Sequence, residues 1–264
     1  MTRMRNNYVR EKLLRGEPSL GAFLGLQSPN VAELFGHHGF EWLLIETEHN
    51  GLDAAEVETM VRAIETTEAI PLVRVPSHDH VPIQRALDTG ALGIKVPMIR
   101  TASEAEAIVK MTRYPPAGTR SWGPMRATGY TAHESDYFER ANDNILVTFI
   151  LETVEGVENL EEICSVQGVD GISIGPADLG AALGYDPLVR THPDIEGVAQ
   201  KMVEVGKKTG VAMGISARSK EDLQKRLEQG FLMINYGADY ALLAALAGEG
   251  VQTFRDSVSD RPHR

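Results

Sequence analysis

A histidine that could act as a general base stands among carboxylates in the first part of the chain. His49 directly follows an apolar run and lies beside Glu46 and Glu48. An imidazole titrates near neutral pH and a neighbouring carboxylate can raise its basicity, so His49 is the best candidate for proton transfer. The alternative is a histidine in a surface turn, because Asn50-Gly51 is itself a turn signal.

Two carboxylates follow neighbouring apolar runs in the second half of the chain. Glu152 comes directly after the run 145–151, and Asp178 follows the run 171–174 within Gly-Pro-Ala-Asp-Leu. Carboxylate oxygens with further positions left for water and substrate suit Mg²⁺, Mn²⁺ or Co²⁺. The alternative is that each carboxylate caps the following helix or pairs with an arginine, since Asp is a common N-cap.

Two cationic side chains interrupt apolar runs. Arg74 lies near the end of the run 70–75, where a guanidinium needs a partner, either one of the glutamates or a carboxylate or keto oxygen of a substrate. A purely structural salt bridge is equally compatible with this position. Lys95, in the middle of the run 92–98, could form an imine with a carbonyl substrate, which is a weaker interpretation than metal chemistry.

These side chains need elements that bring them to one place. The sequence alternates short apolar runs, typical of buried strands, with amphipathic stretches typical of helices. The runs lie at 21–26, 42–45, 70–75, 92–98, 145–151, 171–174, 211–215 and 231–236, and the clearest helical stretches at 54–66, 103–112, 197–208 and 220–228.

Helix boundaries carry their own signals. A capping residue followed three positions later by an acid predicts a helix start, and a glycine predicts a left-handed helix end. The start signals are Asn30 with Glu33, Thr101 with Glu104 and Ser219 with Asp222, and the stop signals are Gly39, Gly90, Gly210 and Gly230.

Eight strands that alternate with helices predict an α/β fold with a parallel sheet and right-handed crossovers. Eight strands also close a (β/α)₈ TIM barrel, and a barrel of this length forms one domain over 1–264. A doubly wound open sheet is the competing fold, but no Gly-rich phosphate-binding fingerprint follows the first run. Because barrel active sites lie at the carboxyl ends of the strands, we expect the side chains that follow the runs, Asp239 among them, to converge there.

The connection 114–144 is much longer than its neighbours and contains Trp122, Pro124 and Arg126. Connections of this length in a compact domain are usually functional or disordered, and aromatic residues are depleted in disordered segments. The sequence therefore predicts a structured, extended loop at the barrel mouth.

The composition excludes several classes of partner. A net charge of −11 argues against nucleic acid or an anionic membrane. Residues 1–17 lack the apolar core of a secretory signal, and no run is long enough to span a bilayer. Cys164 is the single cysteine, which excludes an internal disulfide and a cysteine-based zinc cluster. We expect a soluble cytoplasmic protein.

The residues described above occur in an order that resembles the HpcH/HpaI aldolase family, class II pyruvate aldolases that act on 4-hydroxy-2-oxo acids and 2-keto-3-deoxy sugar acids. The likeness covers nearly the whole chain, and the set in this order is highly specific. The segments that carry it are 32–49, which ends in Ile-Glu-Thr-Glu-His; Pro-Leu-Val-Arg (71–74); Arg-Tyr-Pro-Pro-Ala-Gly-Thr-Arg (113–120); Ile-Leu-Glu-Thr (150–153); and 168–179, which ends in Gly-Pro-Ala-Asp-Leu.

The resemblance implies a catalytic role for each matching residue. His49 matches the family's base, and Arg74 matches the arginine that holds the 2-keto oxygen and stabilises the enolate. Glu152 and Asp178 match the ligands of the divalent metal. Asp88, in Gln-Arg-Ala-Leu-Asp-Thr-Gly, matches an acid that raises the histidine's basicity from a neighbouring subunit.

The resemblance also implies a substrate and an assembly. Ala177 and Asp178 match the start of a helix that binds the pyruvate carboxylate. Trp122, Pro124 and Arg126 on the long loop would line the aldehyde side, and the alternative is that the loop packs on a neighbouring subunit. The family has a phosphoenolpyruvate/pyruvate-type barrel and forms hexamers, trimers of dimers with swapped C-terminal helices. The apolar stretch 240–247 fits this swap, and it fits packing on its own barrel equally well. The implied reaction is reversible retro-aldol cleavage of a 4-hydroxy-2-oxo acid to pyruvate or hydroxypyruvate and an aldehyde.

Two positions depart from the family pattern. Glu46 stands where the family usually has Asp, so the longer side chain could change how His49 is oriented, and Glu48 could orient it as well. Ile150 stands where Gln is common, which removes a polar group from the substrate or water network. Both departures bear on which substrate is used more than on whether the enolate forms.

Three alternative functions remain open on the sequence. An oxaloacetate decarboxylase or synthase, like macrophomate synthase, would use the same enolate. An acyl-CoA lyase would need a basic site for nucleotide phosphates, which this acidic chain does not display clearly. A non-catalytic barrel that only binds keto acids is supported by the two departures alone.

Overall fold

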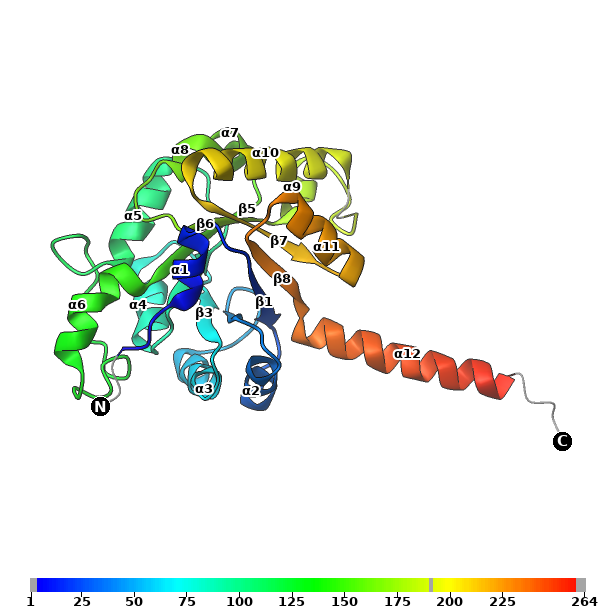
Figure 1. Ribbon diagram of the computed structural model, residues 1–264, viewed down its shortest axis with the longest axis horizontal. Helices are drawn as coiled ribbons and strands as arrows, with labels where there is room; N and C mark the ends of the chain where they lie inside the picture. Colours follow the sequence, from blue (N-terminus) through cyan, green and yellow to red (C-terminus); the bar gives the residue numbers. More distant parts are fainter. Residues whose placement is uncertain (1–3, 190–191, 260–264) are drawn as a thin grey trace.

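The computed structural model describes residues 4–189 and 192–259, so the ends of the predicted domain 1–264 lie outside the described residues. Eight parallel strands pair in sequence order and close into a barrel (Figure 1). The predicted (β/α)₈ barrel is confirmed, and each predicted run overlaps one strand. The strands are β1 (Ser19–Leu24), β2 (Trp42–Glu46), β3 (Ile70–Arg74), β4 (Gly93–Val96), β5 (Leu146–Leu151), β6 (Gly171–Ile174), β7 (Ala212–Ala217) and β8 (Met233–Ala238).

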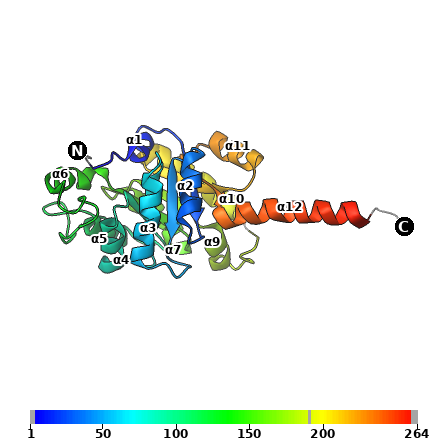
Figure 2. The same cartoon turned by 90° about the horizontal axis from the view of Figure 1, so that it is seen from below.

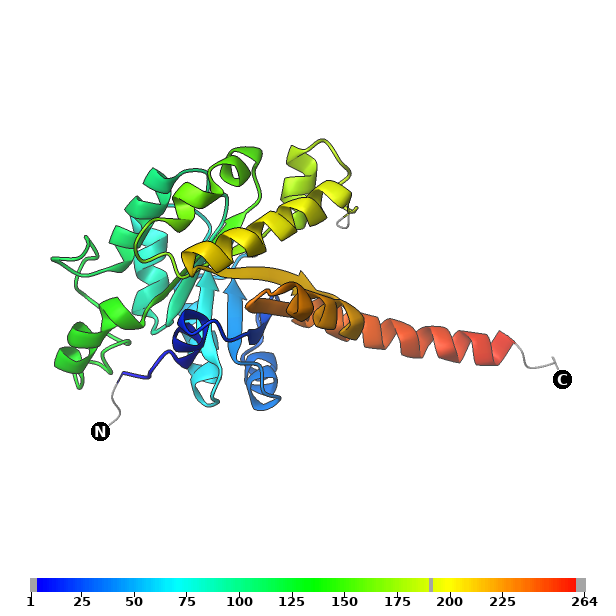
Figure 3. The ribbon, with the colours of Figure 1, turned by 45° about the horizontal axis from the view of Figure 1, so that its top comes forward.

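Helices cover the outside of the barrel, as Figures 2 and 3 show. The first helix packs at the amino-terminal end of the barrel, where Asn7 Nδ2 donates to Leu92 O at 2.8 Å. The helices are α1 (Tyr8–Leu14), α2 (Pro29–His37), α3 (Ala54–Glu65), α4 (His80–Asp88), α5 (Ala102–Thr112), α6 (Glu134–Asn144), α7 (Val154–Glu158), α8 (Leu160–Cys164), α9 (Pro176–Ala182), α10 (Pro193–Thr209), α11 (Lys220–Gln229) and α12 (Asp239–Ser259).

Two of the three predicted helix starts are confirmed. Thr101 forms a capping box at α5, and the Ser219 side chain accepts the Asp222 N–H at α11. The start at Asn30 is wrong by two residues, because Ser28 caps α2 and Pro29 occupies its first turn, where the missing N–H costs nothing. All four predicted stop glycines have positive φ, as left-handed helix ends require.

The tilt of the strands arranges the inward-facing side chains in layers. In a closed barrel of this kind, alternate strands contribute the four side chains of each layer. The pairing register between neighbouring strands places the inward-facing residues of alternate strands at two heights, and these form two layers below the carboxyl-terminal rim. The upper layer holds Phe23, Arg74, Ile150 and Ser216, and the layer beneath it holds Leu44, Lys95, Ser173 and Asn235.

The lower of these layers contains a buried lysine. Lys95 is 2% exposed, and its Nζ donates to Ser173 Oγ at 2.9 Å. The same ammonium lies over the rings of Phe23 and Trp42, 5.9 and 5.4 Å from their centroids. Burial, with the charge of Arg74 as a smaller cause, lowers the pKa of Lys95 from 10.5 to about 7.

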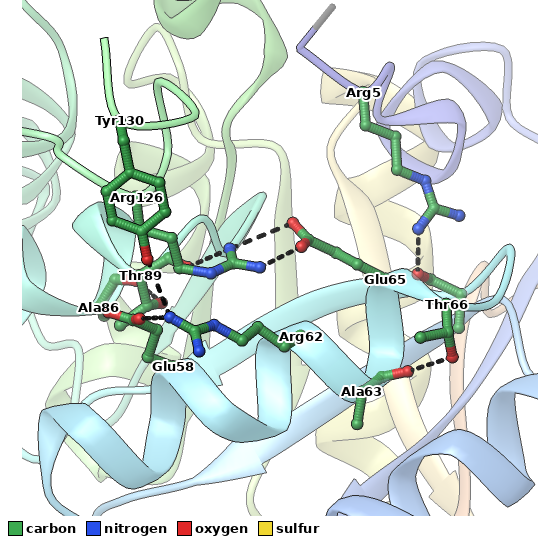
Figure 4. A network of polar contacts seen from close by, with 11 residues as sticks. Arg5, Glu58, Arg62, Ala63, Glu65, Thr66, Ala86, Thr89, Arg126 and Tyr130 are labelled. Atoms are coloured by element: carbon green, nitrogen blue, oxygen red, sulfur yellow. Dashed lines mark hydrogen bonds and ion pairs between the residues drawn. The ribbon is translucent and has the colours of Figure 1, made fainter. Parts of the chain in front are cut away.

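The predicted loop 114–144 consists of turns followed by α6. Arg126 Nη1 donates to Thr89 O at 2.6 Å and its Nη2 pairs with Glu65, while Arg62 Nη2 donates to Tyr130 Oη at 2.9 Å (Figure 4). Glu65 and Thr89 lie at the carboxyl ends of α3 and α4, and these helices run antiparallel to the strands. The sequence predicted a loop at the mouth, whereas these contacts hold its middle part against the outer helices, toward the amino-terminal end of the barrel.

The last helix, α12, points away from the barrel along most of its length (Figures 1 and 2). It exposes large apolar side chains that a helix packed on its own barrel would bury, among them Leu246 at 70% and Phe254 at 69%. A helix long and apolar enough to cross a membrane does not occur in 4–189 or 192–259.

Lys95→Met should raise the melting temperature at pH 7, and this gain should shrink as the pH approaches 10. The unfolded chain has the ordinary lysine pKa, so between pH 7 and 10.5 it binds more protons than the folded protein. The wild-type protein therefore gains stability with rising pH in this window, and the variant lacks that contribution.

Thermal unfolding by circular dichroism at pH 7, 8.5 and 10 measures the difference. Lys110→Met on the exposed side of α5 is the matched control, and it should change the melting temperature little because an exposed ion pair contributes little stability. An equal loss of stability at every pH in Lys95→Met would show that the barrel compensates the buried charge fully.

Candidate active site

A cavity of about 770 Å³ opens at the carboxyl ends of the strands. It is lined by both the rim residues and the two interior layers beneath them. The sequence-predicted site residues that it brings together are Glu46, His49, Arg74, Glu152, Ala177 and Asp178.

Arg74 is held between two glutamates. Its Nη2 lies 2.5 Å from Glu46 Oε2 and its Nε lies 3.1 Å from Glu48 Oε2, although the latter contact lacks the direction of a hydrogen bond. The guanidinium carbon also lies 5.4 Å from the centroid of the Phe23 ring. Three neighbours thus fix a cation at the level of the upper interior layer, where it faces the cavity.

Glu46 also shapes the turn that carries His49. Its Oε1 accepts the backbone N–H groups of Glu48 at 2.7 Å and of His49 at 3.1 Å. The imidazole itself is 65% exposed, and its Nε2 lies 3.7 Å from Glu48 Oε2. Glu46 therefore positions His49 through the backbone, and Glu48 is the carboxylate nearest the ring. Burial raises the pKa of Glu48, which the charge of Arg74 opposes.

Glu152 enters the cavity directly after β5. Its Oε1 accepts the Met98 N–H at 2.7 Å, and Met98 has a φ of 57°, an unfavourable backbone conformation for a residue other than glycine. A Cβ on Gly175, the residue after β6, would lie 2.5 Å from Glu152 Oε2 and 2.9 Å from Glu152 Cβ, so a side chain there would displace this glutamate. Burial, with Asp178 and Glu48 as smaller causes, raises the pKa of Glu152 to about 7.

Asp178 lies in the first turn of α9, beside the same cavity. Gly175 is the N-cap of this helix, so Asp178 does not cap it, and within 4–189 and 192–259 its carboxylate has no hydrogen bond or ion pair. One free oxygen of Glu152 and two of Asp178 fit a hard divalent cation such as Mg²⁺. The described part of the chain gathers no cluster of three metal-binding side chains, so water and substrate would complete the coordination.

Two predicted site residues lie away from the cavity of their own chain. Asp88 is the last residue of α4, at the opposite end of the barrel, and its Oδ1 accepts a hydrogen bond from Arg120 Nη2 at 2.8 Å. Trp122 packs against the rings of Tyr114 and Phe138, with centroid separations of 5.1 and 5.4 Å. Neither side chain can meet a substrate in this cavity unless it comes from a neighbouring subunit.

Asp239, which the sequence placed on the same face, has a structural role. Its buried carboxylate accepts the backbone N–H groups of Gly25 at 2.8 Å, Leu26 at 3.0 Å and Tyr240 at 2.8 Å. It therefore joins the loop after β1 to the start of α12. Among the carboxylates that follow strands, the sequence offered a structural alternative only for Glu152 and Asp178, so this role of Asp239 was not predicted.

Sequence reasoning missed the polar floor of the cavity. Lys95 was considered only as an imine former, and the three other polar side chains were not singled out. The available signal was a polar residue at an alternate, inward position within an apolar run. The floor consists of Lys95, Ser173 and Asn235, and Ser216 lies one layer above it.

Comparisons with known proteins agree with this geometry. A 4-hydroxy-2-oxo-heptane-1,7-dioate aldolase of Shigella sonnei is 38% identical over 242 residues, which cover 91% of this chain and 92% of that protein. A crystal structure of an HpcH/HpaI aldolase/citrate lyase family protein from Burkholderia cenocepacia superposes with a TM-score of 0.90 at 34% identity, covering 94% of this chain and 99% of the other.

A more distant neighbour shares the fold. The citrate lyase β subunit of M. tuberculosis, solved with oxaloacetate and magnesium, has a TM-score of 0.55 at 15% identity and covers 85% of this chain and 93% of the other. The family described as HpcH/HpaI aldolase/citrate lyase matches residues 19–245. With the barrel, the cavity residues and these similarities in agreement, the chain belongs to the HpcH/HpaI aldolase/citrate lyase family.

Proposed function

We propose that this chain is a divalent-metal-dependent class II aldolase that reversibly cleaves a 4-hydroxy-2-oxo acid to pyruvate or hydroxypyruvate and an aldehyde. The observation that carries the proposal is one cavity containing two carboxylates with free oxygens, a fixed arginine and an exposed histidine. The name of the Shigella sonnei relative supports the substrate class, since that protein is an aldolase of a 4-hydroxy-2-oxo diacid.

Glu152 and Asp178 would hold Mg²⁺, Mn²⁺ or Co²⁺ through their uncommitted oxygens. Such an ion supplies positive charge beside the 2-oxo group of the substrate. The magnesium and oxaloacetate bound by the citrate lyase β subunit of M. tuberculosis support this chemistry on the same fold. Because Met98 N–H occupies one oxygen of Glu152, the other oxygen is the one available for a ligand.

His49, Arg74 and the first turn of α9 have different roles in bond cleavage. His49 takes the proton of the 4-hydroxyl, the bond between C3 and C4 breaks, and its electrons move toward the 2-oxo oxygen. Arg74 stabilises the negative charge that develops on that oxygen, and its two glutamate contacts keep it in place beforehand. The substrate carboxylate would bind at Ala177 and Asp178, whose N–H groups precede the first intrahelical hydrogen bond of α9.

We further propose a hexamer, a trimer of dimers in which α12 packs on a neighbouring barrel. The exposed apolar side chains of α12 support this arrangement. In the hexamer, Asp88 and Trp122 would face the site of another subunit, Asp88 near His49 and Trp122 near the aldehyde. We place the enzyme in the cytoplasm, because its one cysteine, Cys164, is buried and unpaired, as expected in a reducing compartment.

Chelation should abolish cleavage, and added divalent metal should restore it. After treatment with EDTA and desalting, release of pyruvate from 4-hydroxy-2-oxoheptanedioate should fall by about 100-fold or more, because the charge beside the 2-oxo group is lost. Mg²⁺, Mn²⁺ and Co²⁺ are then titrated back separately, with Ca²⁺ and K⁺ as controls. Full activity after exhaustive chelation would eliminate the metal mechanism. Oxaloacetate in the same assay separates an aldolase from a decarboxylase.

His49→Ala should lower kcat by about 10²- to 10⁴-fold, since a positioned general base contributes this much. Binding of Mn²⁺, followed by electron paramagnetic resonance, should be retained because His49 is not a proposed ligand. His38→Ala, which changes an exposed histidine at the end of α2, is the matched control and should keep wild-type turnover. A His49→Ala enzyme with near-normal kcat would remove this residue as the base.

Substitution of the apolar face of α12 should break the assembly. The wild-type protein should have the light-scattering mass of a hexamer of 28.9 kDa chains. A double variant, Leu246→Glu with Phe254→Glu, should dissociate into smaller species because two charges would enter an apolar interface. Gln252→Glu on the same helix is the control. A wild-type protein that runs as a monomer would contradict the proposal.

A further inference from the structure

The floor of the cavity contains a cation with unused hydrogen-bonding capacity. Lys95 is 2% exposed, and an ammonium group has three N–H donors. Ser173 Oγ is the only hydrogen-bond acceptor of Nζ in 4–189 and 192–259, and the other near neighbours are the faces of Phe23 and Trp42. Lys95 nonetheless lines the cavity, so its ammonium lies beside the space that a bound molecule would occupy.

An unused acceptor lies in the same layer of the barrel. Asn235 is 7% exposed, and its Nδ2 donates to Ser216 Oγ at 3.1 Å. Its Oδ1 is buried and lacks a hydrogen-bond partner among the described residues. A buried polar atom left unpaired destabilises the protein, so a site that contains one is prepared for a ligand or an ordered water.

The two groups together select a hydroxyl. A hydroxyl accepts from Lys95 and donates to Asn235 Oδ1, whereas a carboxylate only accepts and would face that oxygen. The selection follows from the amide orientation in the structure, in which Nδ2 donates to Ser216 Oγ and Oδ1 is left as an acceptor. A methyl group at this position would leave both polar side chains unsatisfied.

The depth of the floor shows which part of a substrate reaches it. The lysine lies one layer below Arg74, which holds the 2-oxo group in the proposed function, while His49 lies at the open rim. The aldehyde must enter through that rim, so the atoms that reach the floor belong to the 2-oxo acid donor. With its carboxylate and oxo group already engaged, the donor has only C3 left to carry a substituent.

We propose that Lys95 and Asn235 form a subsite for a hydroxyl group on C3 of the donor, which makes the enzyme selective for hydroxypyruvate over donors that lack this hydroxyl. The inference rests on the proposed aldolase function and specifies its donor. A buried lysine with a pKa of about 7 is costly for stability, and a role in selecting substrate explains its presence in the barrel.

The test compares donors that differ only at C3. The metal-loaded enzyme is given pyruvate, hydroxypyruvate or 2-oxobutyrate with one common aldehyde, and kcat/KM is measured for each donor. Wild type should prefer hydroxypyruvate to 2-oxobutyrate, which carries a methyl in place of the hydroxyl, by about tenfold or more. In Lys95→Met this ratio should fall at least tenfold, whatever loss is common to all donors. The ratio is informative because a purely structural defect lowers kcat/KM for every donor by the same factor.

Asn235→Leu tests the same subsite from the opposite side of the barrel and should lower the ratio in the same direction. Lys110→Met on the surface is the control and should keep both the ratio and the wild-type kcat/KM. If wild type processes pyruvate but neither floor variant changes the ratio, an ordered water occupies the floor and the subsite is refuted while the aldolase function stands.

Two further outcomes would also overturn the inference. Selective loss of activity on oxaloacetate, rather than on hydroxypyruvate, in Lys95→Met would show that the floor binds a carboxylate. A wild-type enzyme that processes none of the donors in the presence of metal would refute the proposed function, and the donor subsite would be refuted with it.

Discussion

Closure of the barrel is the constraint on which the site depends. Eight parallel strands can close only if they tilt, and the tilt brings inward side chains from alternate strands to the same height. Arg74 and Ile150, far apart in sequence, therefore share one layer, and Lys95 and Asn235 share the next. Closure also places all the strand ends that carry the acidic residues around a single cavity.

The cavity contains both carboxylates and cations, and two of the cations, Arg74 and Lys95, are held in different ways. Arg74 is paired with Glu46 and Glu48 before any substrate binds. Its orientation is therefore fixed, and part of its positive charge is neutralised. Lys95 lies deeper, without a carboxylate partner among the described residues. Two carboxylates that keep free oxygens beside these cations form an environment suited to a divalent ion and an anionic oxo acid.

The two departures from the family pattern, Glu46 and Ile150, each affect the contacts within the cavity. Glu46 uses its extra length to reach Arg74 and the backbone of the His49 turn, so the histidine is positioned without a direct bond to its ring. Ile150 makes its position in the upper layer apolar, while the layer beneath it contains Lys95 and Asn235. Recognition of the donor is thereby displaced toward the floor of the barrel.

The sequence by itself determined the barrel, because strand and helix periodicities are local properties. It also located the residues at the carboxyl ends of the strands, since polar residues after apolar runs must meet there. These residues are Glu46, His49, Arg74, Glu152 and Asp178. It could not separate Asp178, which does not cap its helix, from Asp239, which binds three backbone N–H groups, because both follow strands and differ only in their neighbours. It could not show that 126–130 packs on outer helices or that Lys95 faces Asn235 across the barrel. Those relations depend on strand register and tilt, which exist only once the chain has closed on itself.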